Sequence, residues 1–179
     1  MNMKALGINA SARKNGNCAI LLTEALKGAK EQGADTEVVF LDELKISAWR
    51  EKLPKDDMNA LLAKIKSADA IILASPIYFG SLSAQAKIMI DRCQGLWVQK
   101  EIKKQKIRQN KAQAAFICAQ AADKKEFFQN ATQIAKNFFA VIEAEYKEEL
   151  FCVGLEKAGD AHKHPEFLKA AYTLGGKIV

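Results

Sequence analysis

Short apolar runs alternate with amphipathic runs along the whole chain, and this alternation constrains the fold more than any other feature. The run at residues 70–74 (AIILA) is apolar at every position, which is typical of a parallel strand buried on both faces. Repeated alternation of strand and helix predicts a parallel sheet with helices on both faces. A chain of 179 residues with five such units fits a single domain at residues 1–179 with a doubly wound α/β sheet of strand order 2-1-3-4-5.

The spacing of apolar residues sets the expected bounds of these elements. The strands are expected at residues 4–9, 36–41, 70–74, 112–119 and 146–153. The helices are expected at residues 17–32, from residue 55 onward, and at 81–92, 124–142 and 166–175. At the start of the second helix, Asp56 or Asp57 can cap the first N–H groups, ahead of apolar residues at helical spacing.

Composition excludes several classes of protein. Hydrophobic residues make up 49% and charged residues 27% of the chain, which are values of a soluble globular domain. No apolar run reaches the length of a membrane span, and the N-terminus lacks the apolar region of a secretory signal. The four cysteines form no C-x-x-C pair. We therefore expect a cytoplasmic protein with no membrane span and no zinc site.

The net charge of +6 comes largely from residues 100–111 (KEIKKQKIRQNK) and from Lys124 and Lys125. A basic patch can bind nucleic acid, attract a phosphorylated cofactor, or form the solvated face of a helix. No aromatic residues are interleaved among these lysines, and acidic residues are scattered through the chain. We therefore expect no nucleic-acid partner.

The loop after the first strand, residues 10–18, combines small residues with hydrogen-bond donors and leads directly into a helix. The first N–H groups of a helix lack partners, and the helix dipole favours negative charge there, so this arrangement predicts an anion site. The candidate ligands are Ser11, Arg13, Asn15, Asn17 and Cys18. The alternative is an ordinary turn with Asn17 as the helix N-cap. Cys18 is either a redox-sensitive thiol with a lowered pKa or a passive member of the loop.

The loop after the third strand, residues 75–83 (SPIYFGSLS), is the second unusual connection. In a 2-1-3-4-5 sheet the strand order reverses between the first and third strands, and ligands bind at that point beyond the carboxyl ends. The two loops are therefore expected to form one site. The second loop offers Pro76, Ile77, Tyr78, Phe79 and Gly80, although the two aromatic rings could instead pack under the end of the sheet.

The two loops together indicate a planar, phosphorylated ligand. The first supplies donors for a phosphate, and the second supplies an aromatic slot beside it. The chain contains neither a G-x-G-x-x-G motif nor a G-K-[ST] motif, so the dinucleotide fingerprint and the Walker A loop are both absent. Flavin mononucleotide (FMN) is the obvious candidate.

At these motifs the chain resembles the flavodoxin-like NADPH-dependent FMN reductases, nearest the branch that includes the iron–sulfur flavoproteins. The resemblance is carried by residues 10–18 (ASARKNGNC), by residues 75–87 (SPIYFGSLSAQAK) with the following I-D-R, and by K-D-D-M at residues 55–58. It implies a three-layer fold, FMN as the cofactor, NAD(P)H as the electron donor, and a homodimer or homotetramer with the flavin near the subunit interface. It also implies phosphate contacts from Ser11, Arg13, Asn17 and Cys18, and the isoalloxazine against residues 76–80.

The chain departs from this branch in three places. In the phosphate loop, Ala10, Ala12 and Cys18 replace the usual Gly, Pro and Thr, and a thiol is a poorer donor than a hydroxyl. Residues 46–54 contain no cysteine where the branch carries a cysteine cluster, so we expect no iron–sulfur cluster. Residues 120–123 (QAAD) replace glycines that approach the flavin. His162 and His164 lack nearby ligands, so no metal site is expected.

The leading hypothesis is an FMN-dependent NAD(P)H oxidoreductase. It would pass electrons to a small acceptor such as a quinone, a nitro compound, free flavin or a metal ion. No catalytic acid or base can be named from the sequence. The alternative is a degenerate flavodoxin-like binding or regulatory protein with weak or no FMN binding. A one-electron carrier is disfavoured, because such carriers tend to be strongly acidic.

Overall fold

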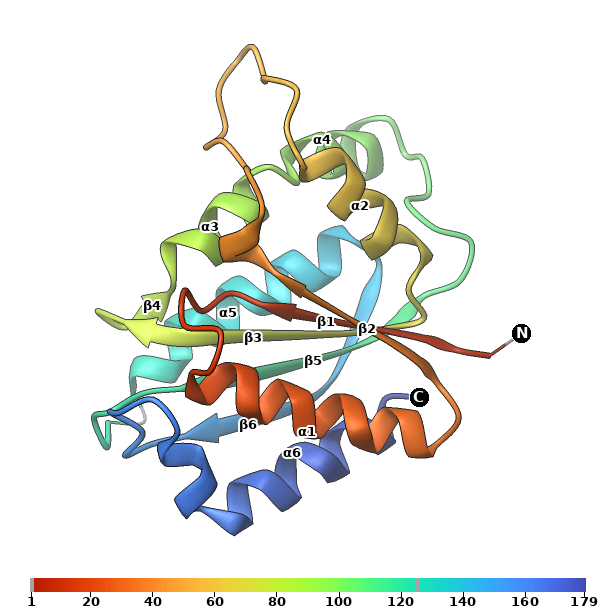
Figure 1. Ribbon diagram of the computed structural model, residues 1–179. Helices are drawn as coiled ribbons and strands as arrows, with labels where there is room; N and C mark the ends of the chain where they lie inside the picture. The colour runs from red at the N-terminus through yellow and green to blue at the C-terminus, as the bar shows by residue number, and fades with distance from the viewer. Residues whose placement is uncertain (1, 125) are drawn as a thin grey trace.

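The computed structural model describes residues 2–124 and 126–179, with a parallel sheet at the centre (Figure 1). The strand order is β2-β1-β3-β5-β6, and the ladders between these strands are all parallel. Apart from the short β4, this is the predicted order 2-1-3-4-5, which confirms the flavodoxin-like α/β class. The strands are β1 (Lys4–Asn9), β2 (Asp35–Phe40), β3 (Ala70–Tyr78), β5 (Ala112–Ala119) and β6 (Ala144–Cys152).

Helices cover both faces of the sheet, as its continuous apolar strands require (Figure 1). One face packs against α1 (Asn17–Glu31) and α6 (Pro165–Lys177). The other packs against α2 (Met58–Ser67), α3 (Ala84–Asp91) and α5 (Glu126–Val141). The predicted start of α5 at Lys124 would include Lys125, which lies outside the described residues.

Short helical turns complete the connections. They are α4 (Gln94–Trp97), a π-helical turn (Val98–Ile102), and 3₁₀ turns at Leu41–Glu43 and Asp160–Lys163. None of the described helices is long and apolar enough to cross a membrane.

β3 is longer than predicted and ends in a hairpin that the sequence did not indicate. The ladder with β5 continues past Ala74 to Pro76. The Ala74 carbonyl accepts a hydrogen bond from Ala10 N on the β1 side. Pro76 lies two residues further along, so its main-chain nitrogen faces the same side, at a position beyond the end of β1. Its missing N–H therefore interrupts no ladder. The chain then turns back as β4 (Ser81–Leu82), antiparallel to the end of β3.

The basic segment is a π-helical turn and a loop rather than the solvated face of a regular helix. Two of its cations contact helix C-termini. Lys100 Nζ donates to Ala140 O at 2.7 Å near the end of α5, and Arg108 donates to Ile65 O near the end of α2. Because the helix dipole favours positive charge at a C-terminus, these contacts account structurally for part of the basic charge.

Candidate functional site

The loops after β1 and β3 meet at the carboxyl edge of the sheet. Ala10 N donates to Ala74 O at 2.8 Å, and Ser83 Oγ donates to Ala10 O at 2.7 Å. Ser83 N donates to Ser75 Oγ at 3.1 Å. Main-chain and hydroxyl contacts therefore hold the two loops side by side at the point where the strand order reverses.

Ser83 connects the two loops and also caps α3, since its Oγ accepts a hydrogen bond from Ala86 N at 3.2 Å. Ser83→Ala removes both contacts from a buried position, so we expect the free energy of unfolding to fall by about 2 kcal/mol. Urea denaturation followed by circular dichroism measures the loss. The control Ser67→Ala removes an exposed hydroxyl from α2 and should change stability by less than about 0.5 kcal/mol. Equal losses in the two variants would contradict the linking role.

A cavity of about 200 Å³ lies between the two loops and reaches the segments after β5 and β6. Its lining residues are Ser11, Arg13, Gly16, Asn17, Cys18, Pro76, Ile77, Tyr78, Ala119, Gln120, Ala121, Leu155 and Glu156. Most of the predicted site residues therefore share one cavity. The predicted residues Asn15, Phe79 and Gly80 lie outside this lining.

Ser11 and Arg13 are placed to bind an anion. Ser11 Oγ accepts a hydrogen bond from Arg13 N at 3.1 Å, which leaves the hydroxyl hydrogen available to an anion. The Arg13 side chain is exposed, and none of the ion pairs in the described part of the chain includes it. Lys14 differs, because it pairs with Glu43, and that contact raises the pKa of Lys14.

The N-terminus of α1 is open to an anion because its cap is Gly16, and not Asn17 as the alternative interpretation had it. Glycine has no side chain to accept from the first N–H groups of the helix. A Cβ at Gly16 would lie 2.9 Å from Arg13 Cβ and 3.0 Å from Arg13 O, so the tight turn excludes a larger residue. The positive end of the helix dipole adds to the attraction for negative charge.

Asn17 holds the site together through a different set of contacts. Its Nδ2 donates to Leu155 O at 3.3 Å and to Lys157 O at 3.0 Å, and its Oδ1 accepts from Ala161 N at 3.1 Å. These contacts occupy both amide hydrogens and the oxygen. The Asn17 side chain therefore holds the start of α1 against the segment after β6. Only the main-chain N–H of Asn17 remains available to an anion.

Cys18 is a core residue, and the hypothesis of a low-pKa thiol is wrong. Its side chain is 2% exposed and packs with the cluster under α1 and α6. Burial, with a smaller contribution from nearby Cys152, raises the pKa of the Cys18 thiol to about 12. The increase in this pKa that desolvation causes is thus larger than the decrease that the helix N-terminus would cause. The replacement of threonine by cysteine here removes a hydroxyl that would itself be buried.

The aromatic residues at the end of β3 and in the turn that follows are exposed, so the alternative of packing under the sheet is wrong. Tyr78 is half exposed and Phe79 is fully exposed. Phe79 and Gly80 both have positive φ, at 51° and 71°, and form the two-residue turn between Tyr78 and Ser81. The left-handed conformation is strained for Phe79 and natural for glycine.

The segments after β5 and β6 also line the cavity. Of these, the sequence indicated only residues 120–123, where related proteins carry glycines that approach the flavin, and it did not indicate Leu155 or Glu156. Gln120 and Ala121 follow β5, and Leu155 and Glu156 follow β6. Their position at the carboxyl edge of the sheet was the available signal. Asn15, by contrast, is exposed and lines a separate hollow that also includes His162.

Comparison with known proteins shows the family to which the chain belongs. Residues 3–146, most of the chain, match the family described as NADPH-dependent FMN reductase. The chain belongs to the NADPH-dependent FMN reductase family.

Relatives of this FMN reductase family member include an iron–sulfur flavoprotein of Methanocaldococcus jannaschii, 40% identical over 103 residues. That match covers 52% of the chain and 53% of the relative, so the chain spans about half the length of the curated relatives it matches. Similar folds include a flavone reductase (TM-score 0.74, 22% identity, 98% of this chain and 62% of that one). Another is the NAD(P)H:quinone oxidoreductase of Methanothermobacter marburgensis (TM-score 0.70, 17% identity, 100% of both chains).

The residues of the cavity fit FMN. At one end, the free hydroxyl of Ser11, the unpaired Arg13 and the open helix N-terminus suit a phosphate. At the other end, Gln120 has a buried side-chain oxygen with no hydrogen-bond partner among the described residues, which suits a donor on the ligand. The Glu156 carboxylate also lines the cavity and is the one group there that disfavours an anion.

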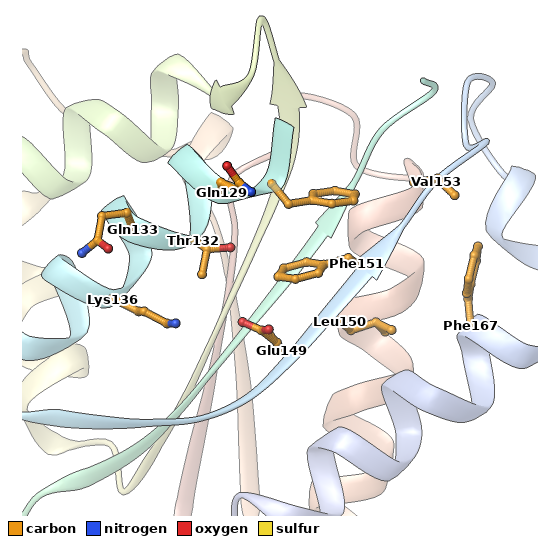
Figure 2. Close-up of a pocket in the computed structure, with 10 residues that line it drawn as sticks. Gln129, Thr132, Gln133, Lys136, Glu149, Leu150, Phe151, Val153 and Phe167 are labelled. Atoms are coloured by element: carbon orange, nitrogen blue, oxygen red, sulfur yellow. The ribbon is translucent and has the colours of Figure 1, made fainter. Parts of the chain in front are cut away.

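A larger cavity of about 710 Å³ lies elsewhere in this FMN reductase family member, between α5, β6 and α6 (Figure 2). Its apolar wall includes Phe128 and Phe151, whose rings stack at 4.7 Å, and Phe167 stands on the α6 side. The cavity lies along the edge strand β6, away from the point where the strand order reverses. The smaller cavity is therefore the candidate cofactor site.

No group of three or more His, Cys, Asp or Glu side chains in the described part of the chain is arranged to hold a metal ion. The four cysteines are buried free thiols. His164 Nδ1 lies 3.0 Å from Glu166 Oε1 at the start of α6, which gives this histidine a local partner.

Proposed function

We propose that residues 1–179 form a single FMN-binding domain that passes electrons from NAD(P)H to a small acceptor such as a quinone, a nitro compound, free flavin or a metal ion. The observation that carries the proposal is one cavity that joins the open N-terminus of α1 and Arg13 to the end of β3. Membership of the NADPH-dependent FMN reductase family supports the nicotinamide donor.

The residues of the cavity divide into two groups in this proposal. Ser11, Arg13 and the main-chain N–H groups at the start of α1 hold the phosphate. Pro76, Ile77 and Tyr78 flank the ring. When bound, FMN would supply the redox chemistry, hydride uptake from the nicotinamide and electron delivery to the acceptor.

The turn beyond the ring-side residues is also held in place. Asn130 Nδ2 donates to Gly80 O at 3.1 Å, which ties the tip of the hairpin to α5. We propose that main-chain N–H groups at Phe79 and Gly80 point toward the ring as hydrogen-bond donors. No side-chain acid or base is assigned a catalytic role.

We propose further that the domain works in the cytoplasm as a homodimer or homotetramer and holds no iron–sulfur cluster. Residues 46–54 lack the thiolates that would ligate a cluster, and the buried cysteines elsewhere are protonated, since burial raises the pKa of Cys93 and Cys152 to about 12.

An absorbance spectrum of the purified protein, before and after addition of FMN and NADPH, tests the proposal. We expect a yellow protein whose flavin absorbance is bleached by NADPH and restored by a quinone. A protein that stays colourless after incubation with FMN would contradict it. FMN affinity in the micromolar range or weaker, without NAD(P)H oxidation by any acceptor, would favour the degenerate binding protein.

Arg13 is expected to recognise the phosphate of FMN. Charge-assisted hydrogen bonds are worth about 1.5–3 kcal/mol, so Arg13→Gln should weaken FMN binding by about 10- to 100-fold. Riboflavin, which lacks the phosphate, should bind the variant and the wild type equally. Quenching of flavin fluorescence gives both dissociation constants. Lys14→Gln is the matched control, because Lys14 pairs with Glu43, and it should change FMN affinity by less than about threefold. Equal losses for FMN and riboflavin in Arg13→Gln would rule out phosphate recognition.

A further inference from the structure

Gln120 has a hydrogen-bond acceptor that the protein itself does not use. Its Oε1 is buried and has no partner among the described residues, and the residue as a whole is 5% exposed. Buried side-chain oxygens are almost always hydrogen-bonded, so an exception calls for an explanation. Other unpartnered atoms, such as Asn9 Nδ2 and Thr132 Oγ1, belong to residues outside the cavity lining, whereas Gln120 lines it.

The orientation of the Gln120 amide is fixed by its neighbours. Nε2 donates to Ala122 O at 2.6 Å and to Lys124 O at 2.8 Å. Both partners are carbonyl oxygens, which can only accept, so exchanging the amide oxygen and nitrogen would lose both bonds. The oxygen is therefore the atom left without a partner.

The Gln120 main chain is fixed as well. Its N–H donates to Cys152 O at 3.0 Å, and its carbonyl accepts from Leu155 N at 3.0 Å. Gly154 N donates to Ala121 O at 3.2 Å. The loop after β5 is thus tied to the segment after β6, and the acceptor is presented from a rigid support, as a pre-organised binding site requires.

The position of Gln120 indicates which end of the ligand it faces. Ala119 is level with Pro76 in the β3–β5 ladder, so Gln120 stands beside Ile77, on the ring side of the site. The oxidised isoalloxazine ring has one N–H donor, the imide N3–H, and its other polar ring atoms accept hydrogen bonds. We propose that Gln120 Oε1 accepts a hydrogen bond from the imide N3–H of FMN, an inference that rests on the proposed function. Gln120 would thereby select flavins whose N3 is unsubstituted.

A two-by-two comparison of variants and ligands tests this contact. The dissociation constants of FMN and 3-methyl-FMN are measured by fluorescence quenching for the wild type and for Gln120→Met, an unbranched replacement of similar size. We expect N3 methylation to weaken binding to the wild type roughly tenfold, and Gln120→Met to weaken FMN binding to a similar degree. Because both changes remove the same hydrogen bond, their effects should not add. The dissociation constant of Gln120→Met for 3-methyl-FMN should exceed that of either single change by no more than about threefold.

The control is Gln113→Met, which replaces a glutamine at the opposite end of β5 and should leave both constants unchanged. Equal weakening of both ligands by Gln120→Met would show that Gln120 only braces its loop, and would overturn the proposal. A wild type that binds FMN and 3-methyl-FMN equally well would also overturn it. A wild type that binds no FMN at all would reject the proposed function itself, which is a different and recognisable outcome.

A second measurement needs no variant. In the wild type bound to ¹⁵N-labelled FMN, a hydrogen-bonded and buried N3–H should give an NMR signal in slow exchange with water. Rapid exchange of that proton would overturn the proposal even if Gln120→Met fails to fold.

Discussion

Gly175→Ala is expected to lower the free energy of unfolding by about 3 kcal/mol or more, because α1 and α6 touch at this residue with no room for a methyl group. A Cβ at Gly175 would overlap the carbonyl oxygen of Ala25 and lie 2.5 Å from its carbonyl carbon. These are main-chain atoms in the middle of α1, so relief requires the helices to move apart. The contact is equally close from the other helix, because a Cβ added at Gly28 of α1 would overlap the Tyr172 carbonyl oxygen on α6.

Gly176→Ala is the matched control one residue further along α6. A Cβ there would meet nothing nearer than Gln32 Cγ at 3.5 Å, which is an ordinary contact. Alanine also has the better helix propensity, by up to about 1 kcal/mol, so this variant should be neutral or more stable than the wild type. Urea denaturation of the two variants gives the comparison. Equal stabilities would mean that α1 and α6 do not approach closely at Gly175.

The sequence was sufficient to predict the sheet order and the two loops, because each depends on local patterns. An apolar run such as residues 70–74 defines a buried strand, and the strand order then places the loops after β1 and β3 together. The resemblance to the FMN reductase family rested on motifs that include those same loops, and the family match over residues 3–146 confirms it.

The parts that could not be predicted depend on contacts between distant residues. Asn17 was expected at the site as a donor or as a helix cap, but its amide bonds to residues 155, 157 and 161. The inward side chain of Cys18 follows from helix phase against a sheet whose packing the sequence does not specify. The acceptor on Gln120 becomes visible only when its neighbours are placed. Similarly, Asp56 or Asp57 was expected to cap α2. Asp57 is the N-cap residue, but its side chain makes no capping hydrogen bond. One oxygen of Asp56 accepts from Met58 N at 3.1 Å, but the main partner of Asp56 is a residue 36 positions away.

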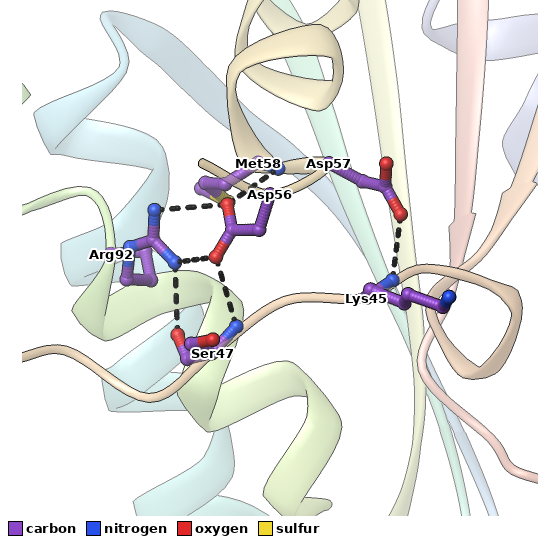
Figure 3. Close-up of polar contacts among 6 residues, drawn as sticks. All are labelled: Lys45, Ser47, Asp56, Asp57, Met58 and Arg92. Atoms are coloured by element: carbon purple, nitrogen blue, oxygen red, sulfur yellow. Dashed lines mark hydrogen bonds and ion pairs between the residues drawn. The ribbon is translucent and has the colours of Figure 1, made fainter. Parts of the chain in front are cut away.

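That partner is Arg92, which follows α3 and forms a buried ion pair with Asp56 (Figure 3). Arg92 Nη1 lies 2.5 Å and Nη2 3.1 Å from the two carboxylate oxygens, and Nη1 also donates to Ser47 O at 2.9 Å. Asp56 Oδ2 accepts in turn from Ser47 N at 3.0 Å. The pair therefore ties both ends of the loop at residues 47–56 to α3.

Arg92→Leu is expected to lower the free energy of unfolding by about 3 kcal/mol, because it leaves the Asp56 carboxylate covered and unpaired. The side chains of Arg92 and Asp56 are only 4% and 7% exposed. Asp56 keeps its hydrogen bonds from Ser47 N and Met58 N in the variant, so we expect the lower end of the range for buried pairs. The control is Asp91→Asn, which breaks the exposed pair with Lys87 on the same helix and should change stability by less than about 0.5 kcal/mol.

The same pair predicts a pH dependence. The hydrogen bonds from Arg92 lower the pKa of the Asp56 carboxyl from 3.8 to about 2. A carboxyl whose pKa is depressed by folding stabilises the folded state fully above its unfolded pKa, and that stabilisation is lost as the pH falls through the folded value. Wild-type stability should therefore decline between about pH 4 and pH 2, and Arg92→Leu should decline less over that interval, because Asp56 then lacks the partner that depresses its pKa.

Urea denaturation at a series of pH values, with Asp56→Ala and the double variant added, separates the pair from general effects. The double variant should be less destabilised than the sum of the two single variants, since neither charge is then left without its partner. Strictly additive losses, with the same acid dependence in all four proteins, would show that the two residues act independently and that the loop at residues 47–56 is held by its main-chain contacts alone.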